Sequence, residues 1–342
     1  MMTTIMQTTR RRDQILECLL AGAMGDALGA DIEFASLAQI RTRFQRGFAN
    51  LPIHQGVQGA ITDDTQMTLF TAEGLVRAAV RWTLKGICHP PGVIHHALLR
   101  WLVTQGETPR AEVDDVGLVA DRRLHARRAP GLTCLDALRQ ARNFGAQAVN
   151  GSKGCGTIMR VAPLVFVAED QIRDLAIECS ALTHGHPTGQ QAAAAWALIL
   201  RSLADGNDLE QAAATHAHSF GAETRDAILR GLQTPADGRP ETTEQLGGGW
   251  TAEEALSIAI HACRCARDLE HGLIVAVTHS GDSDSTGAIA GNALGLMFPG
   301  QARSHRWAAQ VECRDLIERL AMDLAMAMSG EMDDLVTRYP GA

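Results

Sequence analysis

The chain has 342 residues, of which 46% are hydrophobic, 20% are charged and only 4% are aromatic, and its formal net charge is −8. This composition is typical of a soluble globular protein, and the acidic balance argues against nucleic-acid binding, which requires a basic surface. No apolar run approaches the ~20 residues that a membrane-spanning helix needs. The eight cysteines form no CxxC pair, so we expect reduced thiols and a cytoplasmic protein.

Residues 1–12 (MMTTIMQTTRRR) place their basic residues after a weakly apolar stretch. This order is the reverse of a secretory signal, and we expect a flexible arm. From residue 13 onward, apolar residues recur at helical spacing. The spacing predicts helices over 13–30, 64–84, 92–102, 132–149, 171–182, 188–203, 251–267 and 312–328.

Two segments are not assigned to helices by this spacing alone. Residues 161–168 (VAPLVFVA) are compatible with a short strand or with a buried helix, and residues 233–249 are the best candidate for a loop. Strand-like alternation is nearly absent elsewhere. The sequence therefore predicts an all-α protein with a single domain over residues 13–342.

Two acidic clusters, ITDDT (61–65) and HSGDSDSTG (279–287), each introduce an apolar helix. One interpretation is helix capping, for which a single side-chain oxygen is enough. The other is a site for hard divalent cations, because each cluster offers two carboxylates together with hydroxyl groups. Two such clusters that converge in space could hold a pair of ions. The oxygen-bearing residues concerned are Thr62, Asp63, Asp64, Asp282, Asp284 and Ser285.

Three further stretches carry polar candidates. LLAGAMGDALGADIEF ends at Glu33, where the helical pattern breaks, so this carboxylate either faces a cleft or lies exposed at a helix end. NGSKGCGTIMRVAPL (150–164) is either an anion-binding loop or a flexible connection, and its Arg160 either binds phosphate or braces the acidic site. THGHP (183–187) precedes a helix and lacks a third metal ligand, so its histidines more readily suit hydrogen bonding or contact with a ligand base.

Together these stretches resemble the ADP-ribosylglycohydrolase family, and the matching motifs keep the family's order over residues 13–300. The resemblance implies an all-α fold with two Mg²⁺ (or Mn²⁺) ions. By motif, the implied metal ligands are Thr62, Asp63, Asp64, Asp282, Asp284 and Ser285, with Thr286 as the alternative to Ser285. It also implies that Ser152, Gly154 and Gly156 receive the pyrophosphate, that His184 lies near the adenosine, and that Phe144 is a candidate to stack on adenine.

The resemblance further implies hydrolysis of the bond between ADP-ribose and a modified protein side chain. The implied catalytic residues are Glu33, Asp64 and Asp284, with Glu33 or a metal-bound aspartate as general base. N-linked ADP-ribosyl-arginine is the favoured substrate, and O-linked serine or free ADP-ribose derivatives are the alternatives. The expected partner of this monomer is an ADP-ribosylated protein. A different alternative is an immunity protein that reverses or blocks an ADP-ribosylating toxin, with residues 1–12 entering the toxin's cleft.

Overall fold

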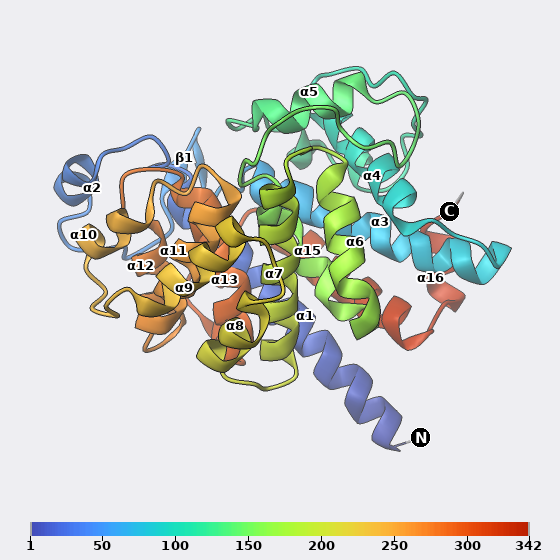
Figure 1. Cartoon of the computed structure of the whole chain (residues 1–342). Coiled ribbons are helices and arrows are strands. Elements are labelled where there is room, and N and C mark those ends of the chain that lie inside the picture. The colour runs from blue at the N-terminus through green and yellow to red at the C-terminus, as the bar shows by residue number, and fades with distance from the viewer. Residues whose placement is uncertain (1, 341–342) are drawn as a thin grey trace.

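The computed structural model describes the backbone of residues 2–340 and the side chains of residues 9–340, and it is almost entirely helical (Figure 1). The α-helices are α1 (Met2–Gly29), α2 (Leu37–Arg43), α3 (Asp63–Lys85), α4 (Pro90–Thr104), α5 (Leu132–Gln140), α6 (Glu169–Ala181), α7 (Pro187–Ala204), α8 (Leu209–Ala217), α9 (Ala222–Gln233), α10 (Pro240–Thr243), α11 (Ala252–Cys265), α12 (Leu269–Val277), α13 (Ser283–Met297), α14 (Gln301–Ser304), α15 (Arg314–Ser329) and α16 (Asp333–Arg338). Six 3₁₀ turns join them: η1 (Leu118–Ala120), η2 (Arg122–His125), η3 (Ile158–Arg160), η4 (Ala162–Phe166), η5 (Glu244–Leu246) and η6 (Ala308–Gln310). Within the described residues, two strands of two residues each, β1 (Ile53–His54) and β2 (Val57–Gln58), pair antiparallel.

The all-α prediction is confirmed, and each predicted helix corresponds to an observed one. Two helix boundaries differ by several residues, and one segment that the spacing left open is now assigned. Helix α1 begins at Met2, so residues 2–12, expected to be a flexible arm, are helical. Helix α5 ends at Gln140 instead of residue 149, because Ala141 leaves the helical conformation with a ψ of 129°. Further along, Gly145 has a φ of +79°, and its N–H donates to His95 Nδ1 at 2.9 Å. Residues 162–166 form a buried 3₁₀ helix, so the helical alternative for this segment is closer to the structure than the strand.

Among the described helices, α1 and α13 form the most extensive contact, and small residues let the two backbones approach closely. A Cβ atom at Gly25 of α1 would lie 1.9 Å from the carbonyl oxygen of Gly287 in α13, and one at Gly291 would lie 2.3 Å from the carbonyl oxygen of Ala21. Only hydrogen atoms fit between backbones at this separation. The contact fixes the start of α13, which carries the second acidic cluster, beside the end of α1.

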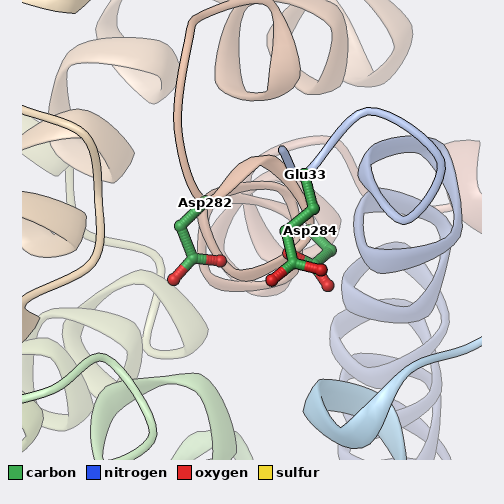
Figure 2. A group of neighbouring side chains, drawn as sticks. All are labelled: Glu33, Asp282 and Asp284. Atoms are coloured by element: carbon green, nitrogen blue, oxygen red, sulfur yellow. The ribbon is translucent and has the colours of Figure 1, made fainter. Parts of the chain in front are cut away.

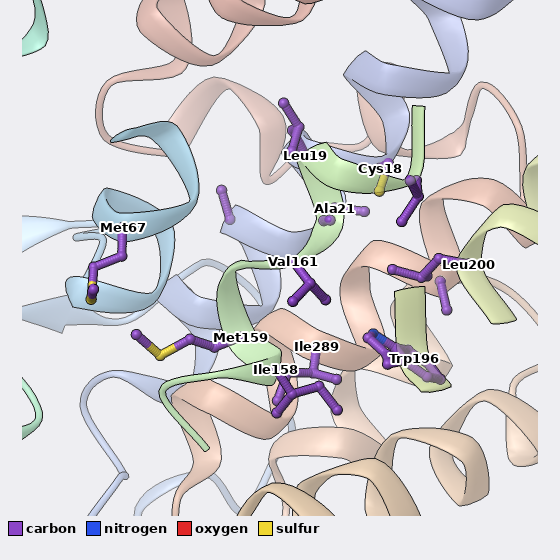
Figure 3. Packing of buried hydrophobic residues seen from close by; sticks show 14 of the residues in the cluster. Cys18, Leu19, Ala21, Met67, Ile158, Met159, Val161, Trp196, Leu200 and Ile289 are labelled. Atoms are coloured by element: carbon purple, nitrogen blue, oxygen red, sulfur yellow. The ribbon is translucent and has the colours of Figure 1, made fainter. Parts of the chain in front are cut away.

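The core is built from close-packed aliphatic side chains with a few large aromatic ones. Residues 158–161 run through it between α1, α7 and α13, so that Met159 and Val161 lie among side chains of all three helices (Figure 3). Trp101, Trp196 and Trp307 are fully buried. This packing holds helices that are distant in sequence in fixed positions around the acidic clusters.

Two expectations from the sequence concerned the cysteines, expected to be reduced thiols, and the helices, none of which was expected to span a membrane. Each of the eight cysteines is a free thiol. Among the described residues, no helix is both long and apolar enough to cross a membrane.

Candidate active site

Three carboxylates from two distant segments converge at one end of α1 and α13 (Figure 2). Glu33 lies in the turn that follows α1, Asp282 directly precedes α13, and Asp284 lies in its first turn. One oxygen atom of each lies within 4.8 Å of the other two, and all three side chains are buried. Like charges at this separation repel strongly in a buried site unless protons or a cation neutralise them.

The surroundings of these carboxylates raise their pKa values. Burial, and then the charges of Asp284 and Asp282, raise the pKa of Glu33 to about 10. Burial and the charge of Asp284 raise the pKa of Asp282 well above its usual range, and burial raises that of Asp284. Displaced pKa values of this kind are typical of catalytic and metal-binding sites.

The first acidic cluster reaches the same place from the N-terminus of α3. Asp63 Oδ2 accepts a hydrogen bond from the Gly131 N–H at 3.1 Å, and burial raises the pKa of Asp63 to about 8. Asp64 Oδ1 is buried without a hydrogen-bond partner, while Oδ2 lies 3.4 Å from the Thr62 hydroxyl. Burial, and then the charge of Asp284, raise the pKa of Asp64 well above its usual range. The two predicted clusters therefore face one another.

The helix-capping interpretation holds for one cluster and fails for the other. The Thr62 side chain is the N-cap of α3 and accepts from the Asp64 N–H. Asp282 occupies the N-cap position of α13 but makes no side-chain capping hydrogen bond. Capping therefore does not account for the aspartates of the second cluster.

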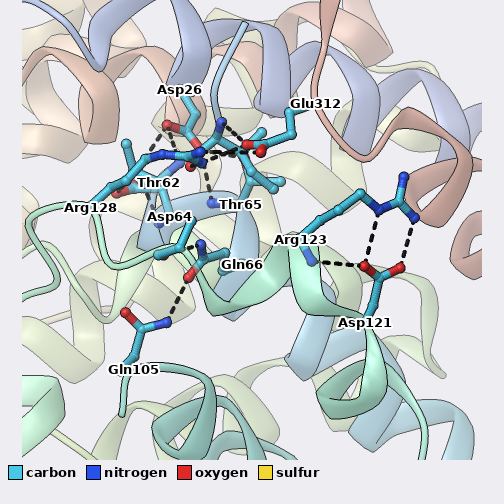
Figure 4. A network of polar contacts seen from close by, with 12 residues as sticks. Asp26, Thr62, Asp64, Thr65, Gln66, Gln105, Asp121, Arg123, Arg128 and Glu312 are labelled. Carbon is cyan, nitrogen blue, oxygen red and sulfur yellow. Dashed lines mark hydrogen bonds and ion pairs between the residues drawn. The ribbon is translucent and has the colours of Figure 1, made fainter. Parts of the chain in front are cut away.

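Two carboxylates, the buried Asp26 and the partly buried Glu312, brace the segment that carries Thr62 (Figure 4). Asp26 of α1 accepts hydrogen bonds from the Thr62 N–H at 3.0 Å, from the Thr62 hydroxyl at 2.8 Å and from the Thr65 N–H at 3.1 Å. Glu312 accepts from the Ile61 N–H at 3.1 Å and from the Arg128 guanidinium at 3.1 Å. Asp26 therefore fixes the first cluster relative to α1.

The alternatives Ser285 and Thr286 differ in what their hydroxyl groups contact. Thr286 Oγ1 lies 2.9 Å from His279 Nε2 and from the carbonyl oxygen of Ala276, on the side of α13 that packs against α12. Ser285 Oγ points toward the thiol of Cys155, at 3.6 Å. Ser285, and not Thr286, therefore lies on the side of α13 that faces the acidic site.

Cys155 links the glycine-rich segment to the acidic site. Its thiol lies 2.8 Å from Asp282 Oδ2 and donates a hydrogen bond to it. Burial and the charge of Asp282 raise the pKa of the thiol well above its usual range, so it keeps its proton at neutral pH. The sequence offered a signal for this contact, since Cys155 lies between Gly154 and Gly156, but it was counted only among the reduced thiols.

The glycine-rich segment is an ordered loop held by side chains. Asn150 Oδ1 accepts from the Ser152 N–H at 3.1 Å and from the Gly185 N–H at 3.0 Å. The Ser152 hydroxyl accepts from the Gly154 N–H at 3.3 Å and lies 3.2 Å from the Thr133 hydroxyl. Ser152 and Thr133 also line a pocket of about 490 Å³, a volume that suits a small-molecule ligand.

His184 lies behind this loop, where it is 1% exposed. A Cβ atom at Gly156 would lie 3.0 Å from the imidazole Cε1 atom, so the absent side chain leaves room for the ring. Arg160 is buried next to it and donates to the Gly156 carbonyl oxygen at 2.9 Å and to the Thr183 hydroxyl at 2.7 Å. Arg160 therefore braces the loop, whereas its two predicted roles were to bind phosphate or to brace the acidic site. Contact between His184 and a substrate stays a prediction.

The aromatic side chains considered for ligand contact lie in two different places, and stacking of Phe144 on adenine stays a prediction. The Phe144 ring packs against His96, with 4.6 Å between ring centroids, and Phe144 is not among the residues that line the pocket beside Ser152. Phe34 and Trp250 instead stack on one another next to Glu33, with 5.7 Å between their centroids. The position of Phe34 after Glu33 was the signal available for this pair, but the partner is 216 positions away in the sequence.

The fold and the site define an all-α protein with a buried carboxylate cluster beside a glycine-rich loop. A profile of the ADP-ribosylglycohydrolase family matches residues 7–334. The chain belongs to the ADP-ribosylglycohydrolase family, and this membership supports glycohydrolase activity on ADP-ribosyl substrates in general.

Similar proteins agree with this assignment. The chain is 23% identical over 334 residues to the ADP-ribosyl-[dinitrogen reductase] glycohydrolase of Rhodospirillum rubrum, with 93% of this chain and 97% of the relative covered. It is 25% identical over 320 residues to an uncharacterised protein of Archaeoglobus fulgidus, with 91% and 96% covered. A solved structure of an ADP-ribosylglycohydrolase-related protein complex superposes with a TM-score of 0.67 at 24% identity, with 94% of this chain and 99% of that chain covered. At this identity the superposition shows a shared fold.

Proposed function

We propose that this protein is a metal-dependent hydrolase that removes ADP-ribose from modified arginine side chains of proteins. The observation that carries the proposal is the convergence of buried acidic side chains: oxygen atoms of Glu33, Asp282 and Asp284 lie within 4.8 Å of one another. The charge of Asp284 also raises the pKa values of Glu33, Asp63, Asp64 and Asp282. Family membership supplies the reaction class, and the relative from Rhodospirillum rubrum carries a name of the same class.

The donor atoms of the site suit two Mg²⁺ ions. Thr62, Asp63, Asp64, Asp282, Asp284 and Ser285 offer only oxygen, which hard divalent cations prefer. Asp64 Oδ1 is buried without a hydrogen-bond partner, which is costly unless a ligand completes its surroundings. When bound, a pair of such ions would act as a Lewis acid and as a template for ribose hydroxyl groups and water.

The side chains of the site then have separate roles in hydrolysis. The bond from the anomeric carbon of the ribose to the guanidino nitrogen breaks, and a bond from the same carbon to a water oxygen forms. Once cations balance the charge of the cluster, Glu33 would be ionised, and it would accept the proton that the water loses and pass it to the leaving nitrogen. Asp282 and Asp284 stabilise the positive charge that develops on the ribose ring. Ser152, Gly154 and Gly156 bind the pyrophosphate through the ordered loop beside the acidic site.

The test is release of ADP-ribose from an arginine-modified protein in the presence of Mg²⁺ and in the presence of EDTA. We expect release with Mg²⁺ and none with EDTA, and a slower reaction on a serine-modified protein. Asp282→Asn should abolish release, whereas Asp226→Asn should leave it unchanged, because Asp226 lies on the exposed surface of α9. Release that is insensitive to EDTA, or a fully active Asp282→Asn variant, would contradict the proposal.

A further inference from the structure

Two aromatic side chains are exposed at the rim of the acidic site. Phe34 is 74% exposed and Trp250 is 44% exposed. Their rings stack with an interplanar angle of 20° and a centroid separation of 5.7 Å. We refer to Phe34 and Trp250 as the aromatic pair. Exposed aromatic rings that lie together commonly mark a binding surface.

The backbone around the aromatic pair joins it directly to the site. Phe34 follows Glu33 in the chain. On the other side, the Trp250 carbonyl oxygen accepts a hydrogen bond from the Cys155 N–H at 3.1 Å. The Asp282 N–H donates to the carbonyl oxygen of Gly248 at 2.8 Å. The pair therefore lies across the two segments that supply Glu33 and Asp282.

The rings of the aromatic pair have no cation of this chain over them. Within the part of the chain that the structure describes, arginines lie over aromatic rings in five places, and neither Phe34 nor Trp250 is one of the rings concerned. The five contacts are Arg11 with Phe166, Arg43 with Phe44, Arg77 with Tyr339, Arg173 with Phe220, and Arg306 with Trp307. The open faces thus remain available to a cation from outside.

We propose that the aromatic pair binds the guanidinium group of the ADP-ribosylated arginine. A planar cation is attracted to the face of an aromatic ring, and tryptophan is the strongest partner. A serine-linked substrate presents no cation at this position, so the pair favours the arginine linkage. This inference rests on the proposed function, and it adds the residues that select the linkage.

The kinetic test replaces both rings by leucine, in Phe34→Leu/Trp250→Leu, which keeps apolar side chains but removes the ring faces. We expect KM for an arginine-modified protein to rise about tenfold, while kcat stays within about twofold of wild type. KM for a serine-modified protein should not change. Trp82→Leu is the matched control, because Trp82 is 62% exposed on α3, outside the site, and it should behave as wild type.

An equal rise in KM for both linkages would overturn the inference, since it would indicate general apolar docking. Wild-type kinetics in the double variant, or a wild-type enzyme that cleaves only the serine linkage, would also overturn it. Dissociation of a dimer in the double variant would show that the pair is covered by a second copy of the chain, which also contradicts the proposal.

A binding experiment separates this inference from the proposed function. The indole N–H resonance of Trp250, assigned by its loss in Trp250→Leu, is followed during titration of the Mg²⁺-loaded protein with ethylguanidinium and, separately, with 1-propanol. A saturable shift with ethylguanidinium, and none with 1-propanol, supports cation binding by the aromatic pair. This conclusion holds even if no ADP-ribose is released from any substrate, because that failure would count against the proposed function only. No shift with ethylguanidinium overturns the inference.

Discussion

Raising the pH should destabilise the metal-free protein, and Glu33→Gln should remove a large part of this effect. The ordinary pKa of a glutamate is 4.5, and the folded protein raises that of Glu33 to about 10. Between these values the folded state keeps a proton that the unfolded state has lost. The free energy of unfolding therefore contains a contribution from Glu33 that is fully present below the unfolded pKa of 4.5. This contribution is lost as the pH rises toward the folded pKa of about 10.

The size of the effect follows from the pKa difference. For one retained proton, the free energy of unfolding falls by about 1.4 kcal/mol with each pH unit between the two pKa values. From pH 6 to pH 8 this amounts to about 2.7 kcal/mol, and partial screening by solvent lowers the expected value to about 2 kcal/mol. Glutamine has no proton to retain in this way, so the variant lacks this contribution to the pH dependence.

The assay is urea unfolding in EDTA at pH 6 and pH 8. The wild-type free energy of unfolding should fall by about 2 kcal/mol more over this interval than that of Glu33→Gln. Glu318→Gln on α15, where Glu318 forms a surface ion pair with Arg314, is the matched control and should keep the wild-type slope. Saturating Mg²⁺ should abolish the difference, because cations then replace the retained protons.

Equal pH dependence of wild type and Glu33→Gln in EDTA would refute this reasoning. It would mean that Glu33 ionises in the folded state as it does in water, and hence that the carboxylates do not face one another without a compensating charge.

Three further outcomes follow from the packing and hydrogen bonds of the site. Asp64→Asn should abolish ADP-ribose release and weaken Mg²⁺ binding in a calorimetric titration, and a wild-type affinity would remove Asp64 from the ligand set. Asp26→Asn should lower Mg²⁺ affinity by about 10- to 100-fold, because it disturbs the hydrogen bonds that orient Thr62; unchanged affinity would show that this bracing is dispensable. Gly25→Ala should destabilise the protein by about 3 kcal/mol in urea unfolding, because its Cβ would overlap the Gly287 carbonyl group. A stability loss below about 0.5 kcal/mol would show that α1 and α13 separate easily.

The sequence was most informative where local chemistry and helical spacing agree. The long amphipathic segments are helices because burial of one face stabilises them wherever they pack. Shorter helices were missed, including α8 and α12, although each begins with an aspartate that caps it, Asp208 and Asp268. A short helix depends mainly on tertiary contacts, so its own residues predict it poorly.

Some features of the site could not be predicted, since they depend on residues that meet only in the folded chain. Asp282 and Cys155 are 127 positions apart and share a hydrogen bond. Phe34 and Trp250 are even further apart in the sequence, and their rings stack in the folded protein. No local pattern encodes such pairs, because helix packing decides which side chains meet.

The sequence by itself determined the all-α class and the chemistry available in the two acidic clusters, because spacing and residue type are local properties. It also provided the small residues that let α1 and α13 approach. Only the tertiary structure decided that Ser285 and not Thr286 faces the acidic site, that Arg160 braces the loop, and that an aromatic pair flanks Glu33. The physical reason is that close helix packing sets both the direction and the neighbours of each side chain.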